Sequence, residues 1–285
     1  MLIDTHAHLY WESFKEDFDD MLQRALQAGV STIINVGVDI EKSKEALKKT
    51  KEELFNIPGL SVYSTIGIHP HETINYSSDV SIHEDMERLD QIYKSGSDKI
   101  VAVGECGLDF FFGNNSGFVP PSISTDQIKT LQKKLFQAHI NLAKKLNMPL
   151  IVHCRDDRSQ NPEKSECWNE VLQMIGDQSA ILHCYSGLSP TTHRALQAPN
   201  LLISFAATVT YPKNEYLREA VKVLPLEKIV LETDCPFLPP QSKRGQRNEP
   251  ANIKEIAQLI ADLKGVSLEE VSHQTTKNAK KIFHI

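Results

Sequence analysis

Short apolar runs rich in β-branched residues alternate along the chain with longer segments of helical periodicity. In the segment from Phe14 to Ala28, apolar residues recur every three or four positions, and the segment from Ile128 to Leu146 follows the same rule. The strand-like runs number eight, at 2–8, 31–37, 61–69, 99–105, 149–154, 179–184, 201–206 and 228–234.

Strands that alternate with helices in this way predict a parallel sheet, and eight of them predict a closed (β/α)8 barrel. Glycine or proline marks the expected helix ends, at Gly29, Gly96, Pro149, Gly176 and Gly265. Pro250 and Ser267 mark the starts of two final helices. We therefore expect an α/β protein with a single domain over residues 1–285, a TIM barrel with an extra C-terminal helix.

Composition is that of an ordinary soluble protein, with 285 residues, 40% hydrophobic and 24% charged. The chain has no apolar run long enough to span a bilayer, and no basic leader followed by an apolar segment precedes Asp4. We expect a cytoplasmic protein without a membrane segment. The net charge of −6 argues against bulk attraction to nucleic acid, so a nucleic-acid substrate would need a local basic site.

The five cysteines follow no CxxC spacing, which argues against a disulfide framework or a zinc ribbon. Four of them directly follow a polar residue at the end of an expected strand. Because side chains alternate along a strand, we expect these four to point away from the polar face and pack against the helices. They are Cys106, Cys154, Cys184 and Cys235.

Polar residues with metal-binding side chains stand near the carboxyl ends of the expected strands. They are His6 and His8 on the first strand, Glu105 on the fourth, His153 on the fifth, His183 on the sixth and Asp234 on the eighth. His6 and His8 share one strand face with Asp4. The carboxyl ends of barrel strands meet at one rim, where barrel enzymes hold their reactive groups. Four imidazoles and two carboxylates exceed the needs of one tetrahedral cation and suit two ions that share a carboxylate.

Seven ordered segments carry a resemblance to a known family. They are IDTHAHL at 3–9, GIHPH at 67–71, GECGLD at 104–109, IVHCRD at 151–156, LHCYSG at 182–187, LETDCP at 231–236 and RGQRNEP at 244–250. Together they resemble the TatD family of metal-dependent deoxyribonucleases, within the wider amidohydrolase-like barrels. The match runs essentially from end to end.

The resemblance implies a set of metal ligands. It implies that His6, His8, Glu105 and Asp234 hold one ion, and that Glu105 also reaches a second ion completed by His153 and His183. Related amidohydrolases commonly bridge their metals with a carbamylated lysine, and Glu105 takes that role here.

Hydrolysis of a phosphodiester explains why two cations are needed. The substrate is anionic, and two cations about 3.5–4 Å apart neutralise it and lower the pKa of bound water. We expect a metal-activated water to attack phosphorus, with Asp234 accepting a proton and Glu105 bridging the ions. Mg²⁺, Mn²⁺ and Zn²⁺ all remain open.

Several further residues are candidates for substrate contact. The resemblance implies that His69 and His71 contact substrate phosphate, although they could also be inactive loop histidines. Arg155 could bind phosphate or pair with Asp109. Arg244 and Arg247 are expected to bind flanking phosphates, with a solvated loop as the alternative.

Two other predictions concern residues beside the site. Glu232 shares a strand face with Asp234, and we expect it to orient a ligating histidine or to form a plain buried ion pair. Aromatic side chains could stack single-stranded ends or pack their own loop. They are Phe110, Phe111, Phe112 and Tyr185.

The leading hypothesis is a monomeric, metal-dependent deoxyribonuclease, an exonuclease acting on single-stranded DNA or frayed ends. A metal-dependent hydrolase of an ester or amide, such as aminoacyl-tRNA, is the alternative, and a third is a barrel whose metals are only structural. An acyl-ester panel tested beside end-labelled DNA separates them. The metal, the polarity of digestion, RNA as a substrate, the oligomeric state and the pathway are not specified by the sequence, although a monomer is expected.

Overall fold

The computed structural model describes residues 1–52, 57–76, 79–112, 123–159 and 161–285. Among these, eight strands form one parallel sheet in chain order, each paired with the next. The strands are β1 Leu2–Ala7, β2 Val30–Asn35, β3 Ser61–Ile66, β4 Ile100–Asp109, β5 Leu150–Arg155, β6 Ala180–Leu182, β7 Leu201–Phe205 and β8 Ile229–Leu231. All eight expected strands are confirmed.

The sheet closes between β1 and the segment that follows β8. Ala7 and Cys235 form a parallel bridge, and the Asp234 N–H donates to His6 O at 2.9 Å. The buried Asp4 carboxylate reinforces this seam, because the Thr233 N–H and hydroxyl donate to it at 2.9 and 2.6 Å. Burial raises the pKa of Asp4 to about 7, against the lowering effect of the Thr233 bonds. The result is the expected (β/α)8 TIM barrel.

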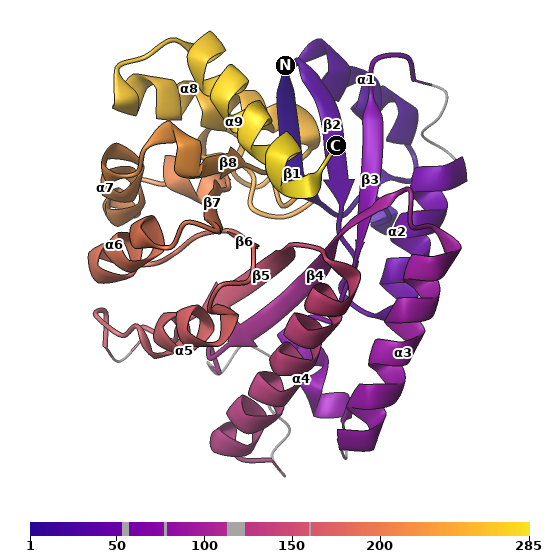
Figure 1. The fold of residues 1–285 in the computed structure, drawn as a ribbon. Coiled ribbons are helices and arrows are strands. Elements are labelled where there is room, and N and C mark those ends of the chain that lie inside the picture. Colours follow the sequence, from indigo (N-terminus) through magenta and orange to yellow (C-terminus); the bar gives the residue numbers. More distant parts are fainter. Residues whose placement is uncertain (53–56, 77–78, 113–122, 160) are drawn as a thin grey trace.

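Helices surround the barrel, and Figure 1 shows them arranged around the strands. They are α1 Phe18–Gln27, α2 Ile40–Glu52, α3 Asp79–Ser95, α4 Thr125–Leu146, α5 Glu166–Ile175, α6 Ser189–Gln197, α7 Glu215–Val223, α8 Ile253–Lys264 and α9 Leu268–Phe283. The helix expected from residue 14 begins instead at Phe18, after a separate 3-10 turn at Glu12–Phe14. Within the described ranges, no helix combines the length and apolar character needed to cross a bilayer.

Two apolar layers hold these elements together. Between strands and helices lies one continuous cluster of buried side chains, which includes Phe14, Phe136 and Trp168. Inside the barrel, a smaller cluster gathers one residue from most strands, and Ala279 and Phe283 of α9 join it. The extra C-terminal helix, which the sequence predicted, therefore packs against the barrel interior as well as β1 and β8.

Strand β4 departs from regular pairing where it carries its functional carboxylate. Its register against β5 shifts between Val103 and Cys106, which places Glu105 in a bulge. Gly104 has a φ of +151°, and a Cβ on it would lie 2.5 Å from the Ile151 carbonyl oxygen. Only glycine fits this approach. The bulge thus requires glycine at position 104.

The packing prediction for the cysteines holds for three of the four. Cys106, Cys154 and Cys235 are buried in the cluster between strands and helices. For Cys184 it is wrong, because its Sγ lies with ligand atoms of His183 and Asp234, all within 4.8 Å of one another. Strand β6 ends before Cys184, whose φ is +41°, so strand alternation no longer sets its direction.

Candidate metal centre

A first candidate metal position lies where β1 meets the chain after β8. His6 Nε2 lies 3.2 Å from His8 Nε2 and 3.4 Å from Glu105 Oε2. Asp234 Oδ1 lies 3.7 Å from His6 Nε2 and 3.4 Å from His8 Nε2. Ligand atoms at about 2.1 Å from one cation lie roughly 3.4 Å from one another, so His6, His8 and Asp234 have about the spacing of a coordination shell, which Glu105 adjoins at His6.

Hydrogen bonding defines which nitrogen of His8 faces this position as an acceptor. His8 Nδ1 lies 3.0 Å from Val36 O, and a carbonyl oxygen can only accept, so Nδ1 carries the proton. The Nε2 lone pair then points at His6 and Asp234. Such acceptor atoms repel one another unless a proton or a cation lies between them. The donor set therefore fits a cation.

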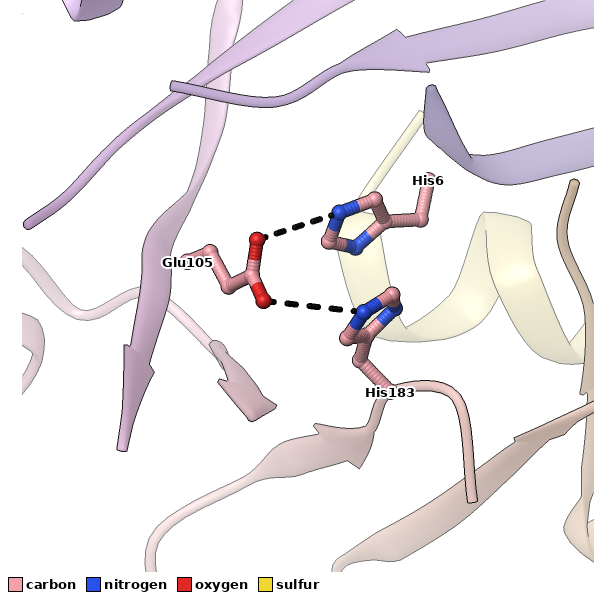
Figure 2. A group of neighbouring side chains, drawn as sticks. All are labelled: His6, Glu105 and His183. Carbon is pink, nitrogen blue, oxygen red and sulfur yellow. Dashed lines mark ion pairs between the residues drawn. The ribbon is translucent and has the colours of Figure 1, made fainter. Parts of the chain in front are cut away.

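A second candidate position lies on the other oxygen of Glu105. Glu105 Oε1 lies 3.0 Å from His153 Nδ1, 3.5 Å from His69 Nε2 and 3.6 Å from His183 Nε2. Figure 2 shows one carboxylate oxygen facing His6 and the other facing His183. One buried carboxylate thus faces two groups of imidazoles.

Electrostatics keep the Glu105 carboxylate ionised. Burial by itself raises its pKa, but the charges of His69, His183 and His6 outweigh burial, and the pKa lies well below its ordinary value. Glu105 is only 4% exposed, so little solvent screens these charges. The group is an anion that can serve two cations together.

Asp109, at the end of β4, fixes the orientation of His153. Asp109 Oδ2 lies 3.1 Å from His153 Nε2, which leaves His153 Nδ1 facing Glu105. The same carboxylate lies 2.9 Å from His71 Nε2 and 2.8 Å from an Arg155 nitrogen. Burial raises the Asp109 pKa, and its bonds to His153 and His71 outweigh burial and lower it. Asp109 was predicted only as a partner for Arg155, although its place at the end of a strand is a signal for a role in the site.

Glu232 is a second buried carboxylate, which lies beside His183 at ion-pair distance without hydrogen-bond geometry. Its Oε1 lies 2.9 Å from His183 Nδ1 and accepts the Cys184 N–H at 2.6 Å. Burial lowers the pKa of His183, but the charges of Glu232 and Glu105 outweigh it and raise the pKa to about 10. Glu232 therefore contacts the ring nitrogen of His183 that faces away from Glu105.

The residues expected to contact substrate divide into two groups. His69, His71 and Arg155 lie beside the second position, and His69 Nε2 faces the Glu105 carboxylate as a candidate ligand. Arg155 is 43% exposed, pairs with Asp109 and lies over the Phe111 ring. Arg155 can therefore pair with Asp109 and still offer exposed surface to a phosphate in the same conformation.

The two arginines after β8 have different surroundings. Arg244 is exposed, with its guanidinium 4.8 Å from the centre of the Tyr211 ring. Arg247 makes two 2.7 Å bonds to the Asp17 carboxylate and lies over the Phe14 ring. The expectation of a phosphate contact does not fit Arg247, because its guanidinium already ties this loop to the start of α1.

The aromatic side chains exposed near the site are not the ones that the sequence predicted. Tyr185 and Phe110 are each 1% exposed, so neither can stack a substrate base, and that prediction is wrong for both. Phe111 and Phe112 are partly buried, and residues 113–122, which follow them, lie outside the described residues. Two aromatic residues that the sequence analysis missed, Trp11 and Phe237, are exposed beside His8. Each lies three positions after a candidate ligand, which is the signal that could have found them.

The similarity of this chain to known proteins extends over its whole length. The family model described as TatD related DNase matches residues 3–284. The uncharacterized metal-dependent hydrolase YabD of Bacillus subtilis is 33% identical over 290 residues, with 100% of both chains covered. The 3'-5' ssDNA/RNA exonuclease TatD of Erwinia tasmaniensis is 30% identical over 289 residues, again with 100% of both covered. The crystal structure of YJJV, a TatD homologue from Escherichia coli K12, superposes with a TM-score of 0.80 at 27% identity, covering 100% of this chain and 98% of the other.

Proposed function

The chain belongs to the TatD-related DNase family and is a metal-dependent hydrolase of ester bonds, and on this premise we propose that it is an exonuclease acting on single-stranded DNA or frayed duplex ends. The relative from Erwinia tasmaniensis is named a 3'-5' exonuclease for single-stranded DNA and RNA. We assign the same polarity to this chain.

One observation carries the proposal. The two oxygens of the Glu105 carboxylate face separate groups of imidazoles, with His6 at 3.4 Å from Oε2 and His153 at 3.0 Å from Oε1. A carboxylate that serves two cations at once is typical of sites that hydrolyse phosphodiesters, because both the attacking and the leaving oxygen need a counter-charge.

The chain's own residues divide the work. His6, His8, Glu105 and Asp234 would hold one divalent cation, and Glu105, His153 and His183 would hold another, with His69 as a further candidate ligand. When bound, the two ions neutralise the phosphate and lower the pKa of water. Asp234 Oδ1 faces His6 and His8, which leaves its Oδ2 to accept the proton that the attacking water loses.

The second half of the rim would orient the phosphate. His71 and Arg155 both contact the buried Asp109 carboxylate, which fixes their direction. Arg155 retains exposed surface and can donate to a non-bridging phosphate oxygen. These contacts would bind the ground state and align phosphorus for attack.

The test uses protein stripped of metal and then supplied with Mg²⁺, Mn²⁺ or Zn²⁺. Substrates are end-labelled single-stranded and duplex DNA, with a panel of acyl esters and an aminoacyl-tRNA in parallel. We expect stepwise shortening of single strands from the 3′ end. Asp234→Asn should abolish it, whereas Asp20→Asn, an exposed acid on α1, should not. Cleavage of the acyl substrates without cleavage of DNA would refute the proposal and favour the ester or amide hydrolase.

A further inference from the structure

Two exposed aromatic side chains form a contact pair at the rim. Among the described residues, the large apolar side chains that remain exposed are Met1, Trp11, Val223 and Phe237. Trp11 and Phe237 touch, with ring centroids 5.1 Å apart and planes at 76°. Exposed apolar surface of this kind commonly marks a binding site. The pair, Trp11 with Phe237, is called the rim pair below.

The rim pair lies directly against the first candidate metal position. The His8 ring centroid lies 5.9 Å from that of Phe237 and 6.2 Å from that of Trp11. A phosphate bound at that position would therefore have the rim pair as its neighbour. The substrate group attached to this phosphate is the group that the pair can contact.

Backbone hydrogen bonds fix both members of the rim pair relative to candidate ligands. The Trp11 N–H donates to His8 O at 3.2 Å, and the Phe237 N–H donates to Asp234 O at 2.9 Å. Each aromatic residue thus ends a tight turn that begins at a candidate ligand. The pair therefore keeps its place relative to the metal position, as a binding surface requires.

We propose that the rim pair is a stacking site for the base of the terminal nucleotide, next to the phosphodiester that is cut. This inference rests on the proposed function. Every nucleobase has a flat π-face, so stacking tolerates any sequence. A base inside a duplex has both faces covered by its neighbours, and only an unpaired end can offer a free face. The rim pair would therefore give the enzyme its preference for single strands.

The chemistry of the pair favours a base over other groups. Its exposed surface is apolar and aromatic, with Trp11 37% and Phe237 41% exposed. The polar side chains that suit phosphate lie on the other side of the rim, at His71 and the guanidinium of Arg155. A nucleotide bound across the rim would place its charged phosphate towards Arg155 and the flat apolar face of its base against the rim pair.

Binding is tested by the fluorescence of Trp11. The chain has two tryptophans, and Trp168 is fully buried. We expect a hydrolysis-resistant phosphorothioate oligothymidylate to quench Trp11 emission in the metal-loaded protein, because stacking brings a base onto the indole. Trp11→Ala should remove the quenching and weaken binding about tenfold, as loss of one stacked base does. Quenching that persists in Trp11→Ala would contradict the proposal.

Turnover is tested with two single-stranded substrates that differ in one base. One ends in an ordinary nucleotide, and the other ends in a stable tetrahydrofuran unit that has no base. We expect Trp11→Ala and Phe237→Ala to raise KM about tenfold for the first substrate and to leave KM for the second unchanged. The conservative changes Trp11→Phe and Phe237→Tyr should restore the wild-type KM.

The control is Val223→Ala, which removes another exposed apolar side chain, at the end of α7. Val223→Ala should leave KM unchanged for both substrates. Equal loss on both substrates, or no loss on either, would overturn the stacking site while leaving the nuclease proposal standing. A wild-type enzyme that shortens no DNA would overturn the proposed function itself.

Discussion

The two halves of the candidate metal centre hold their histidines by different means. In the first half, His8 Nδ1 faces the Val36 carbonyl oxygen at 3.0 Å, and His6 Nδ1 is buried without a hydrogen-bond partner. In the second half, His153 and His183 each face a buried carboxylate, although the His183 contact is an ion-pair distance without hydrogen-bond geometry, and His69 Nδ1 accepts the His71 N–H. His153 contacts Asp109 at 3.1 Å and His183 contacts Glu232 at 2.9 Å.

This difference indicates a division of roles. A carboxylate behind an imidazole makes the ring more basic and fixes its orientation, which strengthens its hold on a metal. A main-chain carbonyl also fixes orientation but raises basicity less, because it carries no net charge, and no side-chain substitution removes it. The second half is therefore the half whose affinity depends on outer side chains, while the first half depends on the closure of the barrel.

The largest effect is expected from Glu105→Gln, because Glu105 belongs to both halves. Its carboxylate lies 3.4 Å from His6 and 3.0 Å from His153. Loss of its charge should remove metal from both positions and lower kcat/KM at least about a thousandfold, since the ions contribute several kcal/mol to transition-state stabilisation. Elemental analysis of the purified variant measures the bound metal. Full metal content would contradict a bridging role.

Asp109→Asn tests the carboxylate behind His153. The amide keeps the shape of the side chain but removes a charge that lies 3.1 Å from His153 Nε2. We expect metal affinity to fall about 10–100-fold, as it does when such outer partners are changed. Tyr10→Phe is the matched change in the first half, where the hydroxyl lies 3.0 Å from His8 Nδ1 but the Val36 carbonyl remains. Chelator competition should show little change for Tyr10→Phe, and equal losses in both variants would erase the contrast between the halves.

Glu232→Gln should have a smaller effect in the same direction. Glutamine keeps an oxygen that can accept the Cys184 N–H, so the local backbone is retained while the charge beside His183 is lost. We expect metal affinity to fall about tenfold. Isothermal titration with Zn²⁺ or Mn²⁺ gives the comparison, and unchanged affinity would reduce Glu232 to a plain buried partner.

The barrel was predictable because its signals are local. Each strand carries its own apolar run, and polar residues at strand ends, such as Glu105 and His183, meet once the sheet closes. What could not be predicted depends on backbone direction or on distant partners. Cys184 does not follow the alternation of strand side chains, because its φ is +41°. Arg247 binds Asp17, which lies 230 positions earlier in the sequence. Neither feature has a signature in the neighbouring residues.

Arg244 and Arg247 provide a smaller test of how the loop after β8 contributes. Arg244→Ala should reduce the slope of log binding constant against log salt concentration for single-stranded DNA by about 0.7, the value for one phosphate contact. Arg247→Ala should leave the slope unchanged, because its guanidinium is paired with Asp17. Anisotropy titrations at several salt concentrations measure both. A flatter slope for Arg247→Ala would return it to the substrate-binding residues.

The smallest effect concerns stability rather than chemistry. Bonds from Arg247, opposed by burial and assisted by Arg24, lower the Asp17 pKa from its ordinary 3.8. A lowered acid pKa stabilises the folded state above pH 3.8, and this contribution is lost as pH falls through the folded-state pKa. Asp17→Asn should therefore cost about 1 kcal/mol at pH 7, since the pair is partly exposed. Urea unfolding should show the difference in free energy of unfolding between wild type and Asp17→Asn becoming smaller below pH 4. A buried acid with a raised pKa, such as Asp4, has the opposite pH dependence, because it makes the folded state less stable as pH rises towards about 7. A difference in free energy of unfolding that becomes larger at acidic pH would contradict the pairing of Asp17 with Arg247.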